Sequence, residues 1–232
     1  MKLKKVCAFG NMKGGVGKST ILSVLANYIH TSTDYSVCVV DADDLQRTLS
    51  SWRESDLKKE GVQEDDLYDL LSINSKDFPK ILNNHLLKEY DFVFVDLPGN
   101  LKQAGVISSY AMVDYIFIPT GLSSADLDST IKYINLYNEE IRPIREKAGF
   151  KCNLFAFLNR INKQMLEYKE FVQMKDSFPV PFLKTDIGTA DVSLQRNAST
   201  VTNYTDNKGG EIFYKFCNEV LEKMNVKEKT IK

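Results

Sequence analysis

The chain has 232 residues, 43% of them hydrophobic and 26% charged, and its formal net charge is −1. This length can bury one full core, and no long Pro-, Gly- or Ser-rich stretch marks a second module, so we expect a single domain over residues 1–232. The balanced charge does not favour a strongly basic nucleic-acid-binding protein, so any affinity for DNA must come from a local patch or depend on the state of the protein.

The cysteines and the start of the chain bear on the cellular compartment. Cys7, Cys38, Cys152 and Cys217 are widely spaced and mostly flanked by apolar residues, which predicts reduced thiols in a cytoplasmic protein. No Cys-x-x-Cys pair or His/Cys cluster suggests a metal site. The apolar run after the first lysines is too short for a signal peptide, and no stretch is long enough to span a bilayer, so we expect no membrane contact.

The first predicted elements enclose a glycine-rich segment, GNMKGGVGKST, at residues 10–20. Val6–Phe9 is an apolar run suited to a buried parallel strand, and the apolar residues at 22, 25, 26 and 29 fall at helical spacing. A strand, a glycine-rich loop and a helix in this order form the context of a phosphate-binding loop.

The residue types in this loop match the chemistry of a bound triphosphate. Backbone N–H groups and the positive end of the following helix face phosphates, a lysine contacts the terminal phosphate oxygens, and a hydroxyl binds Mg²⁺. Lys18 and Ser19 fit the last two roles, and a second lysine, Lys13, lies in the same loop. The residues assigned to the phosphate cradle are Gly14, Gly15, Val16, Gly17 and Lys18.

Acidic residues follow the next two predicted strands. Val37–Val40 is followed by Asp41 and Asp43, and Phe92–Val95 is followed by Asp96. The carboxyl ends of parallel strands lie at one edge of the sheet, so we expect these side chains to meet the loop. Asp96 fits the position that holds Mg²⁺ or its waters, Asp41 supports the metal, and Asp43 orients the attacking water.

Each acidic assignment has an alternative. An aspartate after a strand can cap the next helix or form a turn, which is the alternative for Asp96. Asp43 can instead lie in a solvated loop, with Asp44 as a competing residue for its role. Gly99 follows Asp96 closely and supplies a glycine where a switch loop could approach the γ-phosphate.

The remaining predicted strands are Tyr115–Ile118, Leu154–Leu158 and a short one near Phe182. Strands that alternate with helical patterns predict an α/β fold with a doubly wound, mainly parallel sheet and helices on both faces. Asn159 follows the Leu154–Leu158 run, so we expect it at the same edge of the sheet as Asp41 and Asp96. The alternative is that Asn159 is a simple turn residue. We expect a core helix at about 210–224 and a short polar tail at 225–232.

Several of these segments resemble the ParA/MinD superfamily of P-loop ATPases. Lys13 to Ser19 resembles its deviant Walker A motif, and Asn11 is typical of the ParA branch. Asp41-Ala42-Asp43 followed by Gln46 resembles the Asp-x-Asp-Pro-Gln switch of partition ATPases, with Asp44-Leu45 in place of a single proline. Asp96-Leu97-Pro98-Gly99 resembles switch II, and Ile118-Pro119-Thr120 with Leu127-Asp128 resembles the segment after the fourth strand.

The resemblance implies ATP and Mg²⁺ as cofactors and an ATP-dependent homodimer. In such a nucleotide-sandwich dimer the signature lysine, Lys13, reaches the partner's phosphates, so ATP joins two subunits and hydrolysis releases them. The implied nucleotide contacts are Asn11 in the loop, Thr20 at the α-phosphate, Asn159 at the adenine edge, and Pro181 and Phe182 in the wall of the base pocket.

The implied biological role is that of a small ParA-type ATPase in the cytoplasm, associated with the nucleoid. It would bind double-stranded DNA nonspecifically, respond to a ParB-like adaptor, and partition a plasmid, mobile element or chromosomal locus. A stripe of Lys184, Arg196, Lys208 and Lys215 could contact DNA, with a solvated surface as the alternative. Two other functions stay open: a MinD-like positioning ATPase at a membrane or protein assembly, and a nucleotide-bound interaction module with negligible turnover.

Overall fold

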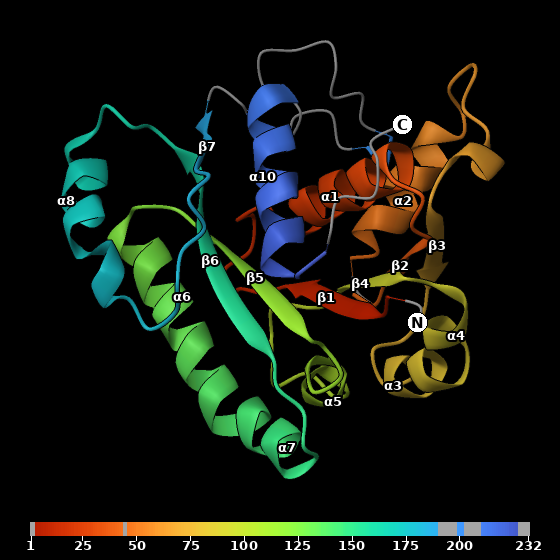
Figure 1. Ribbon diagram of the computed structural model, residues 1–232, viewed down its shortest axis with the longest axis horizontal. Coiled ribbons are helices and arrows are strands. Elements are labelled where there is room, and N and C mark those ends of the chain that lie inside the picture. The colour runs from red at the N-terminus through yellow and green to blue at the C-terminus, as the bar shows by residue number, and fades with distance from the viewer. Residues whose placement is uncertain (1–2, 44–45, 190–198, 202–209, 227–232) are drawn as a thin grey trace.

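The computed structural model describes residues 3–43, 46–189, 199–201 and 210–226. In these residues one seven-stranded sheet has the order β3-β2-β4-β1-β5-β6-β7 (Figure 1). Neighbouring strands in the sheet pair in parallel. The strands are β1 (Lys5–Phe9), β2 (Val37–Asp41), β3 (Asp69–Ser72), β4 (Phe92–Asp96), β5 (Tyr115–Thr120), β6 (Asn153–Ile161) and β7 (Ile187–Gly188).

Helices connect these parallel strands. The longer ones are α1 (Lys18–Ser32), α2 (Thr48–Asp56), α6 (Ser124–Leu136), α8 (Leu166–Met174) and α10 (Gly210–Lys223). The shorter ones are η1 (Glu64–Asp66), α3 (Phe78–Ile81), η2 (Leu82–Leu86), α4 (Leu87–Glu89), α5 (Val106–Tyr110), η3 (Tyr137–Ile141), α7 (Arg142–Lys147) and η4 (Lys175–Ser177). Among the described residues, no helix combines the length and apolar composition that a membrane span needs.

The core lies in two layers, one on each face of the sheet. Because side chains alternate along a strand, Cys7 and Phe9 of β1 pack in the layer that includes α1 and α10. Val6 and Ala8 of the same strand pack in the layer that includes α5 and α6. Figure 1 shows α1 and α10 on one side of the sheet and α3, α5 and α6 on the other. The predicted α/β fold with a doubly wound parallel sheet is therefore confirmed.

The strands predicted from the longer apolar runs are present, but the short strand predicted near Phe182 is wrong. Phe182 forms only an isolated bridge with Ala156. Leu183 N–H still donates to Ala156 O at 2.8 Å, but the N–H groups of Lys184 and Thr185 donate instead to the Glu219 carboxylate, at 2.6 and 2.8 Å, so the pairing goes no further. The chain returns to the sheet only at β7, for which the sequence carries no strand pattern.

A capped turn follows the C-terminal helix α10 at residues 225–226, where the sequence predicts that a polar tail begins. Asn225 has a left-handed backbone with φ of 54°, a conformation that asparagine tolerates better than most residues. The next residue, Val226, donates its N–H to Leu221 O at 3.0 Å and packs in the core. The predicted polar tail therefore begins no earlier than residue 227, which lies outside the described residues.

Candidate functional site

The glycine-rich loop joins β1 to α1 at the carboxyl edge of the sheet. Gly15 and Gly17 have φ angles of 73° and 98°, a left-handed region in which glycine avoids the clash of a Cβ atom. Gly17 lies directly before α1, so the unpaired N–H groups of the first helical turn face the loop. The local structure is therefore suited to bind an anion.

A hollow of about 410 Å³ lies over this loop. Its lining includes Lys18, Ser19 and Thr20 at the start of α1 and Asp43, Asp96 and Gly99 from the neighbouring strand ends. The structure thus brings these predicted residues together. Gly14, Gly15 and Gly17 also line it, whereas Val16 lines a second hollow on the other side of the loop.

The two aspartates at strand ends lie side by side. Asp41 and Asp96 are the last residues of β2 and β4 and are paired in register. Both are buried. Burial raises the pKa of Asp96 to about 7, and nearby Asp41 adds to the rise while the Ser19 hydroxyl and Lys18 oppose it. Asp96 is not a helix cap, since the next helix, α5, begins at Val106.

These residues fit a magnesium ion that is held together with phosphates. Asp41 accepts hydrogen bonds from Ser50 N and Oγ through Oδ2, but its buried Oδ1 has no partner among the described residues. Such an atom can accept from a metal-bound water. No group of three or more His, Cys, Asp or Glu in the described chain could hold a metal alone. Mg²⁺ in phosphate sites commonly uses one or two carboxylates with substrate oxygens and water.

Lys18 lies in the phosphate hollow. Burial lowers the pKa of its ammonium group, and Asp96 and Asp43 oppose this effect. Its Nζ donates to Lys13 O at 3.3 Å, and a Cβ at Gly99 would lie 3.5 Å from that Nζ and only 3.0 Å from Asn11 O. Gly99 therefore allows the segment after β4 to approach the loop closely.

Asp43 is half-buried and accepts the Gln46 N–H at 3.2 Å. It lines the hollow together with Gln46 and Trp52. The inserted pair Asp44-Leu45 lies outside the described residues. The water-orienting role of Asp43 stays a prediction.

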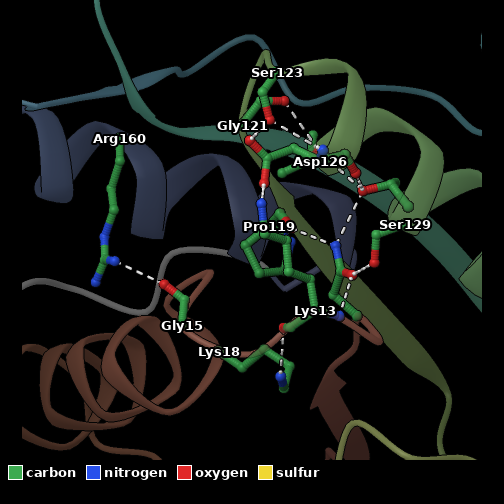
Figure 2. Close-up of polar contacts among 12 residues, drawn as sticks. Lys13, Gly15, Lys18, Pro119, Gly121, Ser123, Asp126, Ser129 and Arg160 are labelled. Atoms are coloured by element: carbon green, nitrogen blue, oxygen red, sulfur yellow. Dashed lines mark hydrogen bonds and ion pairs between the residues drawn. The ribbon is translucent and has the colours of Figure 1, made fainter.

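Lys13 points to the other side of the loop. Its Nζ forms an ion pair with Asp126 Oδ1 at 2.6 Å, and 41% of the side chain is exposed (Figure 2). Lys13, Asp126 and Val16 line the second hollow, of about 400 Å³. Burial would raise the pKa of Asp126, but the hydrogen bonds from Lys13 and Ser123 lower it overall. The two lysines of the loop thus line different hollows.

Asn11 is committed to contacts within the protein. Its Nδ2 donates to Pro119 O and Thr130 Oγ1 at 2.9 and 3.0 Å, and its Oδ1 accepts from Ser129 Oγ and Lys13 N, both at 3.0 Å. The side chain is buried and lines neither hollow. In this state Asn11 fastens the loop to β5 and α6, and a direct contact with a nucleotide stays a prediction.

Asn159 and Arg160 lie in β6, which extends beyond the predicted run. Asn159 Nδ2 donates to Val16 O at 2.8 Å, and Arg160 donates to Gly15 O at 2.7 Å (Figure 2). Asn159 lines the second hollow, so the structure brings it to the loop. Its assignment to the adenine edge stays a prediction.

Pro181 and Phe182 are not brought to either hollow over the loop. Pro181 O accepts the N–H of Ala156 at 2.9 Å, and Phe182 packs against Phe171 and Phe178 with ring centroids 5.1 Å away. Pro181 is thus an exposed residue that pairs with β6 through its backbone, and Phe182 belongs to a small core over β6. Their role at a base stays a prediction without support from this geometry.

The residues of the site that lie outside the sequence-based assignments include Asp126, Ser50 and Arg160. A signal existed for Asp126, because Ser123-x-x-Asp126 is a helix-start pattern and the Ser123 hydroxyl does accept the Asp126 N–H at the start of α6. Ser50 and Arg160 carried no local signal, since their roles depend on contacts with distant segments.

Comparisons with known proteins agree with this architecture. A family model described as VirC1 protein matches residues 1–182. A search of curated proteins gives no match. Solved structures are similar over almost the whole chain, at identities that support a likeness of fold alone.

A Borrelia burgdorferi protein whose structure is described as a plasmid partition protein bound to AMPPNP has a TM-score of 0.68 at 18% identity, covering 96% of this chain and 100% of that one. The Aquifex aeolicus cell division protein MinD has a TM-score of 0.66 at 16% identity, covering 98% and 100%. Pyrococcus horikoshii MinD with Mg-ADP has a TM-score of 0.64 at 19% identity, covering 94% and 96%. The resemblance to the ParA/MinD superfamily is thus confirmed at the level of the fold.

Proposed function

The chain belongs to the VirC1 protein family, and from this premise we propose that it is a ParA-type ATPase that binds Mg-ATP and forms a nucleotide-sandwich homodimer. In this proposal ATP hydrolysis drives the partition of plasmid, mobile-element or chromosomal DNA. Turnover is slow and is stimulated by a ParB-like adaptor, and the ATP-bound dimer binds nucleoid DNA in the cytoplasm.

This proposal rests on the different positions of the two loop lysines. Lys18 lies in the hollow with Ser19 and Asp96, where phosphates would bind. Lys13 instead lies in the neighbouring hollow, partly exposed and paired with Asp126. A cation held at the surface beside the loop is available to the phosphates of a second copy, where it would act as an arginine finger does.

The residues of the phosphate hollow support hydrolysis. Bound Mg²⁺ would neutralise charge on the β- and γ-phosphate oxygens. We expect Ser19 and Asp96, which line the hollow, to hold it, and the Oδ1 atom of Asp41 to accept from its water shell. Asp43 lines the same hollow, and we expect its carboxylate to orient the attacking water.

The decisive experiment measures assembly and turnover of Lys13→Ala. We expect wild-type protein to sediment as a dimer with Mg²⁺ and AMPPNP and as a monomer without nucleotide. Lys13→Ala should still bind nucleotide but remain monomeric, with ATP hydrolysis reduced by about 10³-fold, the lower range of a lost finger.

Lys163→Ala is the matched control, because Lys163 is also an exposed loop lysine paired with an aspartate, Asp186, at 3.2 Å. It should dimerise like wild type. A Lys13→Ala protein that dimerises and hydrolyses ATP normally would refute the sandwich assignment. If wild-type protein binds AMPPNP but does not hydrolyse ATP, the result would favour the nucleotide-bound interaction module.

A further inference from the structure

Two neighbouring side chains of β6 contact two consecutive carbonyl groups of the phosphate loop. Arg160 donates to Gly15 O at 2.7 Å, and Asn159 Nδ2 donates to Val16 O at 2.8 Å. Figure 2 shows the Arg160 side chain extended towards Gly15. Asn159 is 3% exposed, whereas Arg160 lies at the surface, where it lines both hollows over the loop.

An irregularity in β6 makes this double contact possible. Successive side chains of a regular strand point to opposite faces of the sheet, so only one of two neighbours could reach the loop. Arg160 has a left-handed backbone with φ of 58°, and the register with β7 shifts between Asn159 and Ile161. Such bulges redirect side chains beside functional sites, and an arginine adopts this backbone only at a cost in free energy.

The geometry of the peptide bond gives these contacts a consequence for ligand binding. In a planar trans peptide the C=O and the N–H point in opposite directions. The carbonyl of Gly15 shares its peptide with the N–H of Val16, and the carbonyl of Val16 shares its peptide with the N–H of Gly17. A donor that holds each carbonyl away from the loop interior therefore turns the paired N–H towards it.

We propose that Asn159 and Arg160, the anchor pair, are positioning residues that aim the N–H groups of Val16 and Gly17 at bound phosphates. This inference rests on the proposed function, because it requires that the loop binds a nucleotide. It differs from the adenine-edge assignment of Asn159 in a measurable way. An anchor acts on any ligand with a polyphosphate, whereas a base contact acts only on ligands with adenine.

The test compares binding of Mg-ATP with binding of inorganic tripolyphosphate and Mg²⁺. Trp52, the single tryptophan, lines the phosphate hollow and can report binding by its fluorescence. We expect Asn159→Ala and Arg160→Ala each to weaken both ligands by the same factor, about tenfold, because each substitution removes one hydrogen bond that orders the loop. Arg160→Lys, which keeps a cationic donor, should restore part of the loss.

Two controls separate this effect from damage to the fold. Asn162→Ala changes another asparagine that lines the second hollow, and Arg142→Gln removes one exposed charge from α7, which precedes the amino end of β6. Both should bind like wild type. Nuclear magnetic resonance adds a direct signature: tripolyphosphate should shift the amide resonances of Val16 and Gly17 in wild type and shift them less in Arg160→Ala.

The outcomes are distinct. If Asn159→Ala weakens ATP binding but not tripolyphosphate binding, Asn159 is a base contact and the inference is wrong. If Arg160→Ala keeps wild-type affinity for both ligands, or wild type binds ATP but not tripolyphosphate, the anchor pair has no such role. If wild type binds neither ligand, the proposed function itself fails.

Discussion

At the scale of single residues, the ion pair between Lys13 and Asp126 sets the starting state for the proposed dimer. The pair is partly exposed, with side-chain exposures of 41% and 18%, so water screens it and its contribution to stability is small. An interaction this weak holds the Lys13 side chain beside Asp126, but it still allows the side chain to move to an anion that binds it more strongly.

Asp126→Asn should therefore favour assembly rather than impair it. Removal of the carboxylate frees Lys13 in both protomers, and two pairs worth up to about 1 kcal/mol each correspond to up to about 30-fold tighter dimerisation with Mg-AMPPNP. Sedimentation velocity over a range of protein concentrations measures this. Asp128→Asn, an exposed aspartate on the same helix, is the control, and equal assembly of the two variants would show that Asp126 does not restrain Lys13.

Gly10 carries a second prediction at this scale. A Cβ atom at Gly10 would lie 2.0 Å from the Tyr133 hydroxyl oxygen and 2.3 Å from its ring, so Tyr133 would have to move within a packed core. Gly10→Ala should lower the free energy of unfolding by about 1–3 kcal/mol, as overpacking does. Gly14→Ala is the matched control, since nothing lies within 4 Å of its Cβ position. Thermal and urea unfolding would decide, and equal stability of both variants would contradict the prediction.

The residues that the sequence could assign are those whose chemistry is local. Lys18, Ser19 and Gly15 belong to one continuous segment whose residue types follow from the anion that the loop binds. Arg160 could not be assigned, because its contact with Gly15 depends on a bulge that only the pairing with β7 creates. Asn11 was placed in the correct loop, but its partners in α6 lie more than a hundred residues away.

At the scale of elements, α2 is held to the rest of the fold by a buried polar network. Asp56 at its end is fully buried and accepts from Lys59 Nζ, Thr200 N and Thr200 Oγ1 at 2.5, 2.6 and 2.9 Å. Arg53, one turn earlier, donates to Thr200 Oγ1 and to Tyr68 O. The helix that follows the Asp43 loop is thus fixed to residues 199–201 and to the segment before β3.

This network predicts a pH dependence of stability. Burial would raise the pKa of Asp56, but hydrogen bonds from Lys59, Thr200 and Ser199 lower it overall. A lowered pKa in the folded state means that the ionised group stabilises the fold above its unfolded pKa of about 3.9, and that this contribution is lost as the pH falls through the folded value.

Asp56→Asn should cost about 1–3 kcal/mol at pH 7, because an amide cannot accept all of these hydrogen bonds. The difference from wild type should shrink below about pH 4. Urea unfolding at pH 7 and pH 3 measures it, with the exposed neighbour Glu54→Gln as the control. A difference that is the same at both pH values would show that the charge of Asp56 is not the stabilising feature.

Elements buried on both faces were predictable, and those at the edges were not. Continuous apolar runs such as Phe92–Val95 have a single interpretation as central strands. β3 lies at the sheet edge with mostly exposed side chains, and β7 has only two residues, so neither leaves a pattern in the sequence. Their positions follow from pairing with β2 and β6, which is tertiary information.

At the scale of the whole molecule, the two faces of the sheet differ in what they offer to a large partner. α10, with Lys215, packs on one core layer, and the segment with α3 and α4 packs on the other. Lys184 and Lys215 line a common hollow of about 480 Å³ beside α10. Arg196 and Lys208, the other members of the proposed stripe, lie outside the described residues.

DNA binding should therefore depend on the α10 face and on assembly. With a net charge of −1, a monomer has no overall attraction for DNA, but a dimer presents the lysines twice. If four lysines replace counterions, affinity in Mg-AMPPNP should fall by about a hundredfold between 50 and 200 mM salt. Fluorescence anisotropy with labelled duplex DNA measures this, with anionic liposomes as the competing ligand.

The double variant Lys184→Ala/Lys215→Ala removes all four of these lysines from the dimer, so it should lose most of the affinity and most of the slope of log affinity against log salt, whichever DNA sequence is used. Lys80→Ala/Lys88→Ala removes the same charge from the exposed surface of the α3–α4 segment on the opposite face. It should bind DNA like wild type, because a sequence-independent contact depends on where the charge lies and not on the total. Equal losses in both variants would place the DNA elsewhere, and binding to liposomes instead of DNA would favour the MinD-like alternative.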